Sequence, residues 1–160
     1  MAGFGSPKNG KKKVNGRPKM LQTNGVTLFE SAIQFHLGGD LENAERLYRE
    51  AIKNEYNHQD AYMNLGVICR ASGRPKEAIS LYEKAIQINP FNPNVYFNLG
   101  NLYSDLGILD KALASTLKSL ELNPDNPDAE INLGCIYKDL GDLDQALAST
   151  LKSLELNPDN

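Results

Sequence analysis

The sequence repeats itself with a period of 34 residues, and this period constrains the fold more than any other feature. The segment ALASTLKSLELNPDN occupies residues 112–126 and recurs unchanged at residues 146–160. Residues 93–111 and 127–145 add ten further identities in the same register. Extending the period backwards divides the chain into units 1 to 4, at residues 25–58, 59–92, 93–126 and 127–160. A fixed period of this length is the signature of a stacked-repeat architecture.

Each unit has the pattern of two helices, and unit 3 shows it most clearly. Pro93 suits a helix start, and Gly107 suits a helix end. Between them the apolar residues follow at spacings of three and four, at Tyr96, Leu99, Tyr103 and Leu106. A second helix begins near Leu109 and stops at Asn123-Pro124. Helices of about 12–14 residues are marginal alone in water, so the units must stack into an all-α solenoid.

Gly100 lies in the middle of the first predicted helix of unit 3. A glycine at such a position costs about 1 kcal/mol relative to alanine. A close approach between the two helices of the unit explains its presence, and we expect Ala112 to be the facing small residue.

The positive charge is concentrated at the N-terminus. Residues 1–24 hold six lysine and arginine residues and no acidic residue, whereas the whole chain has a net charge of -3. This segment is rich in Gly, Pro and Asn and has no helical or strand period, so we predict a disordered basic tail. Contact of the tail with nucleic acid or an anionic surface is not favoured, because no aromatic or arginine-rich pattern accompanies the lysines.

Other features of the composition exclude several classes of protein. No apolar run approaches the roughly 18 residues of a membrane span. No apolar stretch follows the N-terminal lysines, as a secretory signal would require. The two cysteines, Cys69 and Cys135, form neither a disulfide framework nor a zinc-binding pattern. We therefore expect a cytoplasmic protein with no membrane span, no metal and no cofactor.

The pattern within the units resembles the tetratricopeptide repeat family. That family favours an aromatic residue at position 4 of the unit, Leu at 7, a small residue at 8, Tyr at 11, Ala at 20, an aromatic at 24, Ala at 27 and Pro at 32. Unit 2 matches with Tyr62, Leu65, Gly66, Ala78, Tyr82, Ala85 and Pro90, and has Cys69 at position 11. The resemblance covers residues 25–160 and implies a right-handed superhelical solenoid of four antiparallel helix pairs.

The other units depart from the family pattern at a few positions. Units 3 and 4 have hydroxyl side chains at positions 24 and 27, namely Thr116, Ser119, Thr150 and Ser153. Unit 4 also has Glu130 at position 4. Unit 1 is the weakest match, with Leu28, Ser31 and Tyr56 where Trp, Leu and Pro are usual. An atypical terminal unit is expected of a cap.

The resemblance implies a concave groove lined by the first helices of the units. Position 6 faces this groove in the family and is Asn64, Asn98 and Asn132 here, with Glu30 in unit 1. This row resembles the asparagine ladder of the O-linked N-acetylglucosamine transferase superhelix. Each Asn offers one acceptor and two donors, so a row of them suits the backbone of an extended peptide. The alternative is that these are neutral surface residues of a common repeat pattern.

Position 5 borders the same groove and is apolar in every unit. It is Phe29, Met63, Phe97 and Ile131, and Asn101 at position 9 completes the predicted peptide-binding set. Met and Phe suit adaptable peptide recognition, but these side chains are equally suited to packing on the adjacent helix. The basic clamp by which some members of the family capture a C-terminal carboxylate is absent, because none of its Lys and Arg positions carries a cation here.

No arrangement for catalysis stands out. His36 and His58 lack a nucleophile at a recognisable spacing, and we expect both to be solvated. We therefore predict a non-enzymatic interaction module that holds a peptide or a partner helix. The alternative is the targeting or substrate-recruiting portion of a larger transferase, such as a sulfotransferase or glycosyltransferase, with a catalytic domain beyond residue 160.

The last predicted helix leaves apolar residues without a following unit to cover them. These are Leu147, Leu151, Leu154 and Leu156. Burying a leucine is worth about 1.5–3 kcal/mol, so this surface favours association. We expect either that the natural chain continues past Asn160 or that two chains meet isologously at this end.

Overall fold

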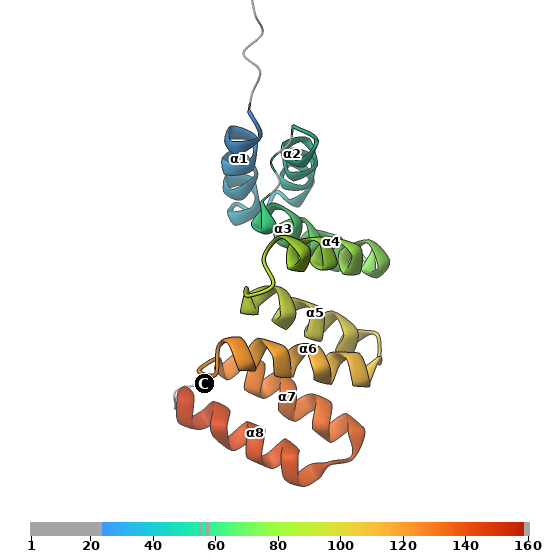
Figure 1. The fold of residues 1–160 in the computed structure, drawn as a ribbon, viewed down its shortest axis with the longest axis vertical. Helices are drawn as coiled ribbons and strands as arrows, with labels where there is room; N and C mark the ends of the chain where they lie inside the picture. Colours follow the sequence, from blue (N-terminus) through green and yellow to red (C-terminus); the bar gives the residue numbers. More distant parts are fainter. Residues whose placement is uncertain (1–23, 55, 57, 159–160) are drawn as a thin grey trace, which may run out of the picture.

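The computed structural model describes residues 24–54, 56 and 58–158. This part of the chain forms helices only, and the helices follow one another as four consecutive pairs (Figure 1). Their bounds are α1 (Gly25–Leu37), α2 (Leu41–Lys53), α3 (Gln59–Ala71), α4 (Pro75–Ile88), α5 (Pro93–Asp105), α6 (Leu109–Leu122), α7 (Pro127–Leu140) and α8 (Leu143–Leu156). The predicted all-α solenoid of four helix pairs is confirmed.

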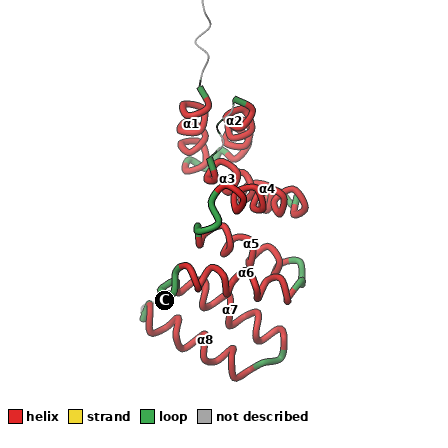
Figure 2. The backbone as a smooth tube through the Cα atoms, in the orientation of Figure 1, coloured by secondary structure: helices red, strands yellow, loops and turns green. Residues whose placement is uncertain are grey.

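The pairs stack along the long axis of the molecule, from α1 and α2 at one end to α8 at the other (Figure 1). The helices of the first pair run along this axis, whereas α5 to α8 run across it, so the pair direction turns along the stack (Figure 2). Helices α3, α5 and α7 each contact the second helix of the preceding pair, and α5 also contacts α3 and α7. Successive first helices therefore lie next to one another over the later units.

The ends of the helices follow from the local sequence. Asn24, Asn92 and Asn126 cap α1, α5 and α7, and each side-chain oxygen accepts a hydrogen bond from a backbone N–H in the first turn. The sequence assigned Asn24 to the basic tail, whose other residues lie outside the described part of the chain. The turn inside each pair contains one glycine with φ between 69° and 85°, at Gly39, Gly73, Gly107 and Gly141.

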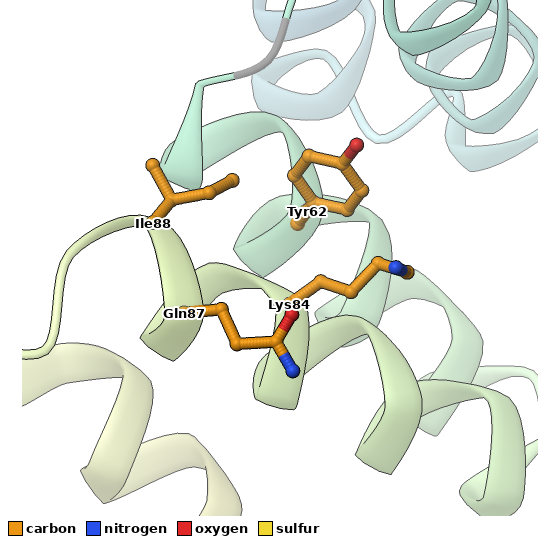
Figure 3. A pocket seen from close by; sticks show the side chains of 4 residues that line it. All are labelled: Tyr62, Lys84, Gln87 and Ile88. Carbon is orange, nitrogen blue, oxygen red and sulfur yellow. The ribbon is translucent and has the colours of Figure 1, made fainter.

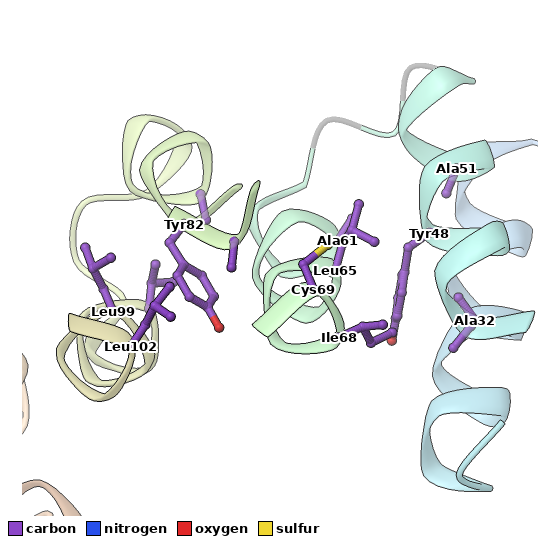
Figure 4. Close-up of a cluster of buried hydrophobic side chains, with 14 of the residues drawn as sticks. Ala32, Tyr48, Ala51, Ala61, Leu65, Ile68, Cys69, Tyr82, Leu99 and Leu102 are labelled. Carbon is purple, nitrogen blue, oxygen red and sulfur yellow. The ribbon is translucent and has the colours of Figure 1, made fainter. Parts of the chain in front are cut away.

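The core lies between the helices of each pair and between neighbouring pairs. Tyr48 and Tyr82 are its largest fully buried side chains. In Figure 4, Ile68 of α3 lies beside the ring of Tyr48 on α2, so the aromatic residue at position 24 joins one unit to the next. Burial of this kind is the main favourable term in stacking helices that are marginal alone.

Three of the four hydroxyl residues that depart from the family pattern, Thr116, Ser119 and Ser153, are buried, whereas Thr150 is exposed. The Ser119 hydroxyl donates to the backbone oxygen of Pro93 at 2.9 Å, and the Ser153 hydroxyl donates to that of Pro127 at 3.1 Å. Both bonds give a buried serine hydroxyl a partner at the start of the first helix of the same unit. The alanine usual at position 27 is thus replaced by a polar contact between the two helices of a unit.

Gly100 lies at a close helix contact, as expected, but its nearest neighbour is different from the predicted one. A Cβ added at Gly100 would lie 2.5 Å from Oγ1 of Thr116, whereas Ala112 contributes only its backbone oxygen at 3.5 Å. The residue at position 24 of the unit, which lies on the second helix, therefore faces the glycine. Its ring or hydroxyl fills the space beside the glycine. Gly66 repeats the contact against the ring of Tyr82.

Candidate functional site

Three half-buried asparagines at position 6, Asn64, Asn98 and Asn132, lie on the successive first helices α3, α5 and α7. The Asn64 amide Nδ2 donates to the Tyr48 hydroxyl at 3.2 Å. The Asn132 amide Nδ2 donates to the Thr116 hydroxyl at 3.1 Å. Each bond uses one donor of the amide and leaves a second N–H and the carbonyl oxygen to other partners.

The two acceptors, Tyr48 and Thr116, occupy position 24 of the unit before the asparagine. The same inter-unit bond thus forms between a second helix and the next first helix at two of the three junctions. These hydroxyls were not predicted as part of the site. Their signal in the sequence is a hydroxyl at position 24, 16 residues before an asparagine at position 6.

His36 is half-buried next to Tyr48, not solvated as predicted. Its Nδ1 lies 3.3 Å from the Tyr48 hydroxyl, and the two rings are edge-to-face with centroids 6.0 Å apart. Burial lowers the pKa of His36 and raises the pKa of Tyr48. At neutral pH the tyrosine hydroxyl therefore keeps its proton, accepts from Asn64 and is placed to donate to a neutral His36.

The middle junction is built differently. Tyr82 is fully buried, and its hydroxyl has no hydrogen-bond partner among the described residues. Burial raises its pKa to about 12. Asn98, which follows it by 16 residues, makes no side-chain hydrogen bond within the same part of the chain. An ion pair between Arg70 and Asp105, at 2.7 Å, links α3 to α5 at this junction.

Tyr48→Phe and Tyr82→Phe form a matched pair of predictions. Loss of the Tyr48 hydroxyl removes the Asn64 bond, and we expect unfolding free energy to fall by about 1 kcal/mol. Loss of the unpartnered Tyr82 hydroxyl should leave stability unchanged or raise it, because no bond is broken and a desolvated group is removed. Urea unfolding of both variants measures the difference. Equal destabilisation would show that the two hydroxyls are equivalent.

The residues at position 5 do not share one environment. Phe29 is only 9% exposed, stacks on Tyr56 with ring centroids 4.8 Å apart and contacts the ring of Tyr48 at 5.8 Å. Met63 and Phe97 are half-buried, and Ile131 is 40% exposed. Tyr56, which replaces the usual proline of unit 1, covers Phe29. The apolar side chains accessible on the predicted groove therefore belong to units 2 to 4.

Asn101, the last member of the predicted peptide-binding set, is half-buried on α5, one turn after Phe97 and Asn98. Cys135 occupies the same position on α7 and is exposed. The asparagines and the apolar residues of position 5 thus continue on α3, α5 and α7, while unit 1 contributes the exposed Glu30.

A separate open pocket of about 320 Å³ lies away from these residues. Figure 3 shows its lining side chains, Tyr62 from α3 and Lys84, Gln87 and Ile88 from α4. None of the four belongs to the predicted groove. Its lining has one cation, Lys84, and one phenol, Tyr62, and neither a carboxylate nor an imidazole among these four residues.

Four charged side chains join α2 to α4 in an ionic cluster. Arg49 contacts Glu45 at 2.8 Å and Glu77 at 2.6 Å, while Arg74 contacts Glu45 at 2.5 Å and Glu77 at 3.0 Å. Burial raises the pKa of the neighbouring Cys69 thiol to about 11, so this cysteine is protonated at neutral pH and unreactive.

In the part of the chain that the structure describes, no three His, Cys, Asp or Glu residues group as metal ligands would.

The molecule is a helical-repeat solenoid, because antiparallel helix pairs stack with a period of 34 residues. In units 2 and 3 the glycine at position 8 packs against the residue at position 24. The chain belongs to the tetratricopeptide repeat family. Models of the tetratricopeptide repeat match residues 38–93, 81–114 and 127–160. Members of this family generally act as non-catalytic scaffolds for protein–protein interaction.

Solved structures share the fold at low sequence identity. A crystal structure of MamA is 24% identical over 85% of this chain and 80% of that chain, with a TM-score of 0.80. A MamA fragment from Desulfovibrio magneticus RS-1 is 22% identical over 86% and 77%, with a TM-score of 0.78. YrrB, described as a TPR protein with an unusual peptide-binding site, is 21% identical over 85% and 70%, with a TM-score of 0.75.

No curated protein matches the chain. None of the helices described has the length and apolar character needed to cross a bilayer.

Proposed function

We propose that the chain is an interaction module that binds an extended peptide segment of a partner protein along α3, α5 and α7. The observation that carries this proposal is the repeated orientation of the position-6 asparagines. Asn64 and Asn132 are each held by a hydroxyl of the preceding unit, at 3.2 and 3.1 Å. An amide fixed in this way has lost rotamer freedom before the ligand arrives, so less entropy is lost on binding.

The chemistry of these asparagines suits a peptide backbone more than a particular side chain. Each amide presents a donor and an acceptor, the complement of a backbone C=O and N–H. One such contact per unit provides a regular set of hydrogen bonds that is tolerant of sequence. Met63 and Phe97, half-buried beside the asparagines, supply adaptable apolar contacts. The peptide-binding site of YrrB, which shares this fold, supports the same use of the solenoid here.

Asn98 is the best single residue for a test. Its side chain makes no hydrogen bond within the described residues, so replacing it breaks no hydrogen bond of the fold. We expect Asn98→Ala to leave the thermal midpoint unchanged and to weaken peptide binding by about 1 kcal/mol, or roughly fivefold. Replacing Asn64, Asn98 and Asn132 together should abolish measurable binding. The probes are fluorescein-labelled 12-residue peptides selected from a random displayed library on the full chain, and the readout is fluorescence anisotropy.

Asn43→Ala is the matched control, because Asn43 lies on the second helix α2 and its amide donates to Asp40 of its own turn. This variant should bind the selected peptides like the parent. The proposal fails if selected peptides bind the triple variant with undiminished affinity while its melting curve shows an intact fold.

A further inference from the structure

The open pocket of unit 2 lies outside the proposed peptide groove, and its polar side chains have no partners of their own. Tyr62, Lys84 and Gln87 line it, and Ile88 supplies an apolar side (Figure 3). Within the described part of the chain, none of the three polar side chains makes a hydrogen bond or an ion pair. All three can donate, and Lys84 is charged. The pocket therefore presents several donors and one positive charge, with no acceptor bound to them.

The repeat shows what the same lysine does in the other units. Position 26 is a lysine in units 2, 3 and 4, at Lys84, Lys118 and Lys152. Nζ of Lys118 lies 2.8 Å from Oε1 of Glu121, and Nζ of Lys152 lies 2.5 Å from Oε1 of Glu130. Both pairs form within one unit. In units 3 and 4 the lysine is therefore neutralised by a glutamate of its own unit, whereas Lys84 is not.

Unit 2 has neither of these two carboxylates. Gln87 stands at position 29, where unit 3 has Glu121, and Tyr62 stands at position 4, where unit 4 has Glu130. Each difference exchanges an anionic acceptor for a neutral side chain that can donate a hydrogen bond. Where units 3 and 4 have a carboxylate beside the lysine, unit 2 has an open pocket of about 320 Å³. The chemistry that this pocket lacks is thus a carboxylate.

The given chain offers few carboxylates of its own for this pocket. Glu83, the neighbour of Lys84 on α4, is exposed and makes no ion pair with it. Residues 1–23, which lie outside the described residues, contain no acidic side chain. Of the other undescribed residues only Glu55 and Asp159 are acidic, and Asp159 follows α8, two units away. Glu55, between α2 and α3, is therefore the internal competitor that a test must include.

We propose that the pocket of unit 2 is a carboxylate-binding site, filled by a glutamate side chain of a partner protein. Lys84 pairs with the carboxylate, while the Tyr62 hydroxyl and the Gln87 amide donate to its remaining lone pairs. Ile88, which is 37% exposed, packs against the CH2 groups of the glutamate. Glutamate is favoured over other acids because glutamates hold the matching lysines of units 3 and 4. The site shares no residue with the asparagine row, so it does not depend on peptide binding there.

The probe is N-acetyl-glutamate amide, titrated into the full chain at low ionic strength and followed by NMR of labelled isoleucine and leucine methyl groups. Ile88 is the reporter, and Ile108, which is 40% exposed in the turn before α6, is the internal reference. Because ion pairs open to solvent are weak, we expect the shift of Ile88 to saturate in the millimolar range. The neutral isostere N-acetyl-glutamine amide should give no saturable shift.

Lys84→Gln should abolish the saturable shift of Ile88, because it removes the charge that pairs with the carboxylate. Lys76→Gln is the matched control, because Lys76 is an exposed lysine of the same helix that does not line the pocket. It changes the net charge by the same amount and should leave the affinity unchanged. Both variants should melt like the parent, since neither lysine makes an ion pair among the described residues.

The repeat also allows the site to be built in unit 3. Glu121→Gln gives unit 3 the tyrosine, lysine and glutamine of unit 2 at positions 4, 26 and 29, with Leu122 in place of Ile88. In this variant the methyl groups of Leu122 should respond to the probe with saturation, whereas in the parent they should not. Gln87→Glu makes the reverse change in unit 2 and should abolish the response of Ile88, because Lys84 then has a carboxylate of its own.

Four results would overturn the proposal. The first is a shift of Ile88 that is absent, or equal for the glutamate and glutamine probes. The second is equal binding to Lys84→Gln and Lys76→Gln. The third is stronger binding to Glu55→Gln than to Glu42→Gln, a variant of equal charge, which would assign the pocket to a carboxylate of this chain. The fourth is tighter binding of N-acetyl-glutamine, whose only carboxylate is terminal, which would assign the pocket to a C-terminus.

Discussion

Replacing Gly100 with leucine is expected to lower the free energy of unfolding by about 3 kcal/mol or more. A Cβ at this position would lie 2.5 Å from Oγ1 of Thr116 and 3.3 Å from its backbone nitrogen. The side chain of Thr116 is fully buried and has no room to turn away. Helices α5 and α6 must therefore separate, which also displaces the Thr116 hydroxyl that accepts from Asn132.

The control for this change is Ala114→Leu, which adds the same bulk at an exposed position of α6 and should leave stability within about 0.5 kcal/mol. Urea unfolding gives the magnitude, and amide hydrogen exchange shows where the damage spreads. Neighbour coupling in a repeat stack predicts weaker protection in units 2 and 4 as well. Melting of Gly100→Leu at the temperature of the parent would show that α5 and α6 do not meet at this glycine.

Removing the side chain of Lys152, the ion-pair partner of Glu130, is also expected to lower the free energy of unfolding substantially. Glu130 stands at position 4, where units 2 and 3 have Tyr62 and Tyr96, and its side chain is only 4% exposed. Its Oε1 accepts from Nζ of Lys152 on α8 at 2.5 Å. Lys152→Ala leaves a buried carboxylate without its cation. We expect a loss of about 2–3 kcal/mol, at the lower end for buried pairs because Lys152 is half-exposed.

The repeat supplies a matched control in Lys118→Ala. Lys118 has the same position on α6, but its partner Glu121 is exposed, so the loss should be no more than about 0.5 kcal/mol. Adding Glu130→Tyr to Lys152→Ala should restore stability, because it places in unit 4 the aromatic residue of units 2 and 3. Thermal and urea unfolding of the four proteins provide the comparison. Equal losses at Lys118 and Lys152 would mean that the Glu130 carboxylate is solvated.

Much of the fold follows from the sequence because the repeat fixes the register of every element. Pro93 begins α5, Gly107 has the positive φ of a turn, and α6 ends at Leu122 before Asn123-Pro124. These signals act through local backbone conformation, which a short stretch of sequence determines. The stacking of units follows from the same period, since helices of 13 or 14 residues need neighbours.

The details of the candidate site depend on contacts between units, and the sequence does not specify those. The asparagines at position 6 were predicted as a row, but their bonds to Tyr48 and Thr116 depend on how far one pair turns relative to the next. Phe29 belonged to the predicted apolar line, but it is buried because Tyr48 and Tyr56 pack against its ring. The Arg70–Asp105 pair also joins helices 35 positions apart in sequence.

The identity of residues 112–126 and 146–160 has a consequence for how such a chain changes in length. A recombination event between the two coding copies removes or adds one whole period, with no change at the junction. In the shortened chain α5 is followed by the α8 copy, so Gly100 meets the same threonine as before. A gene of this kind can therefore lengthen or shorten its product by whole units while keeping the packing at each junction between helices.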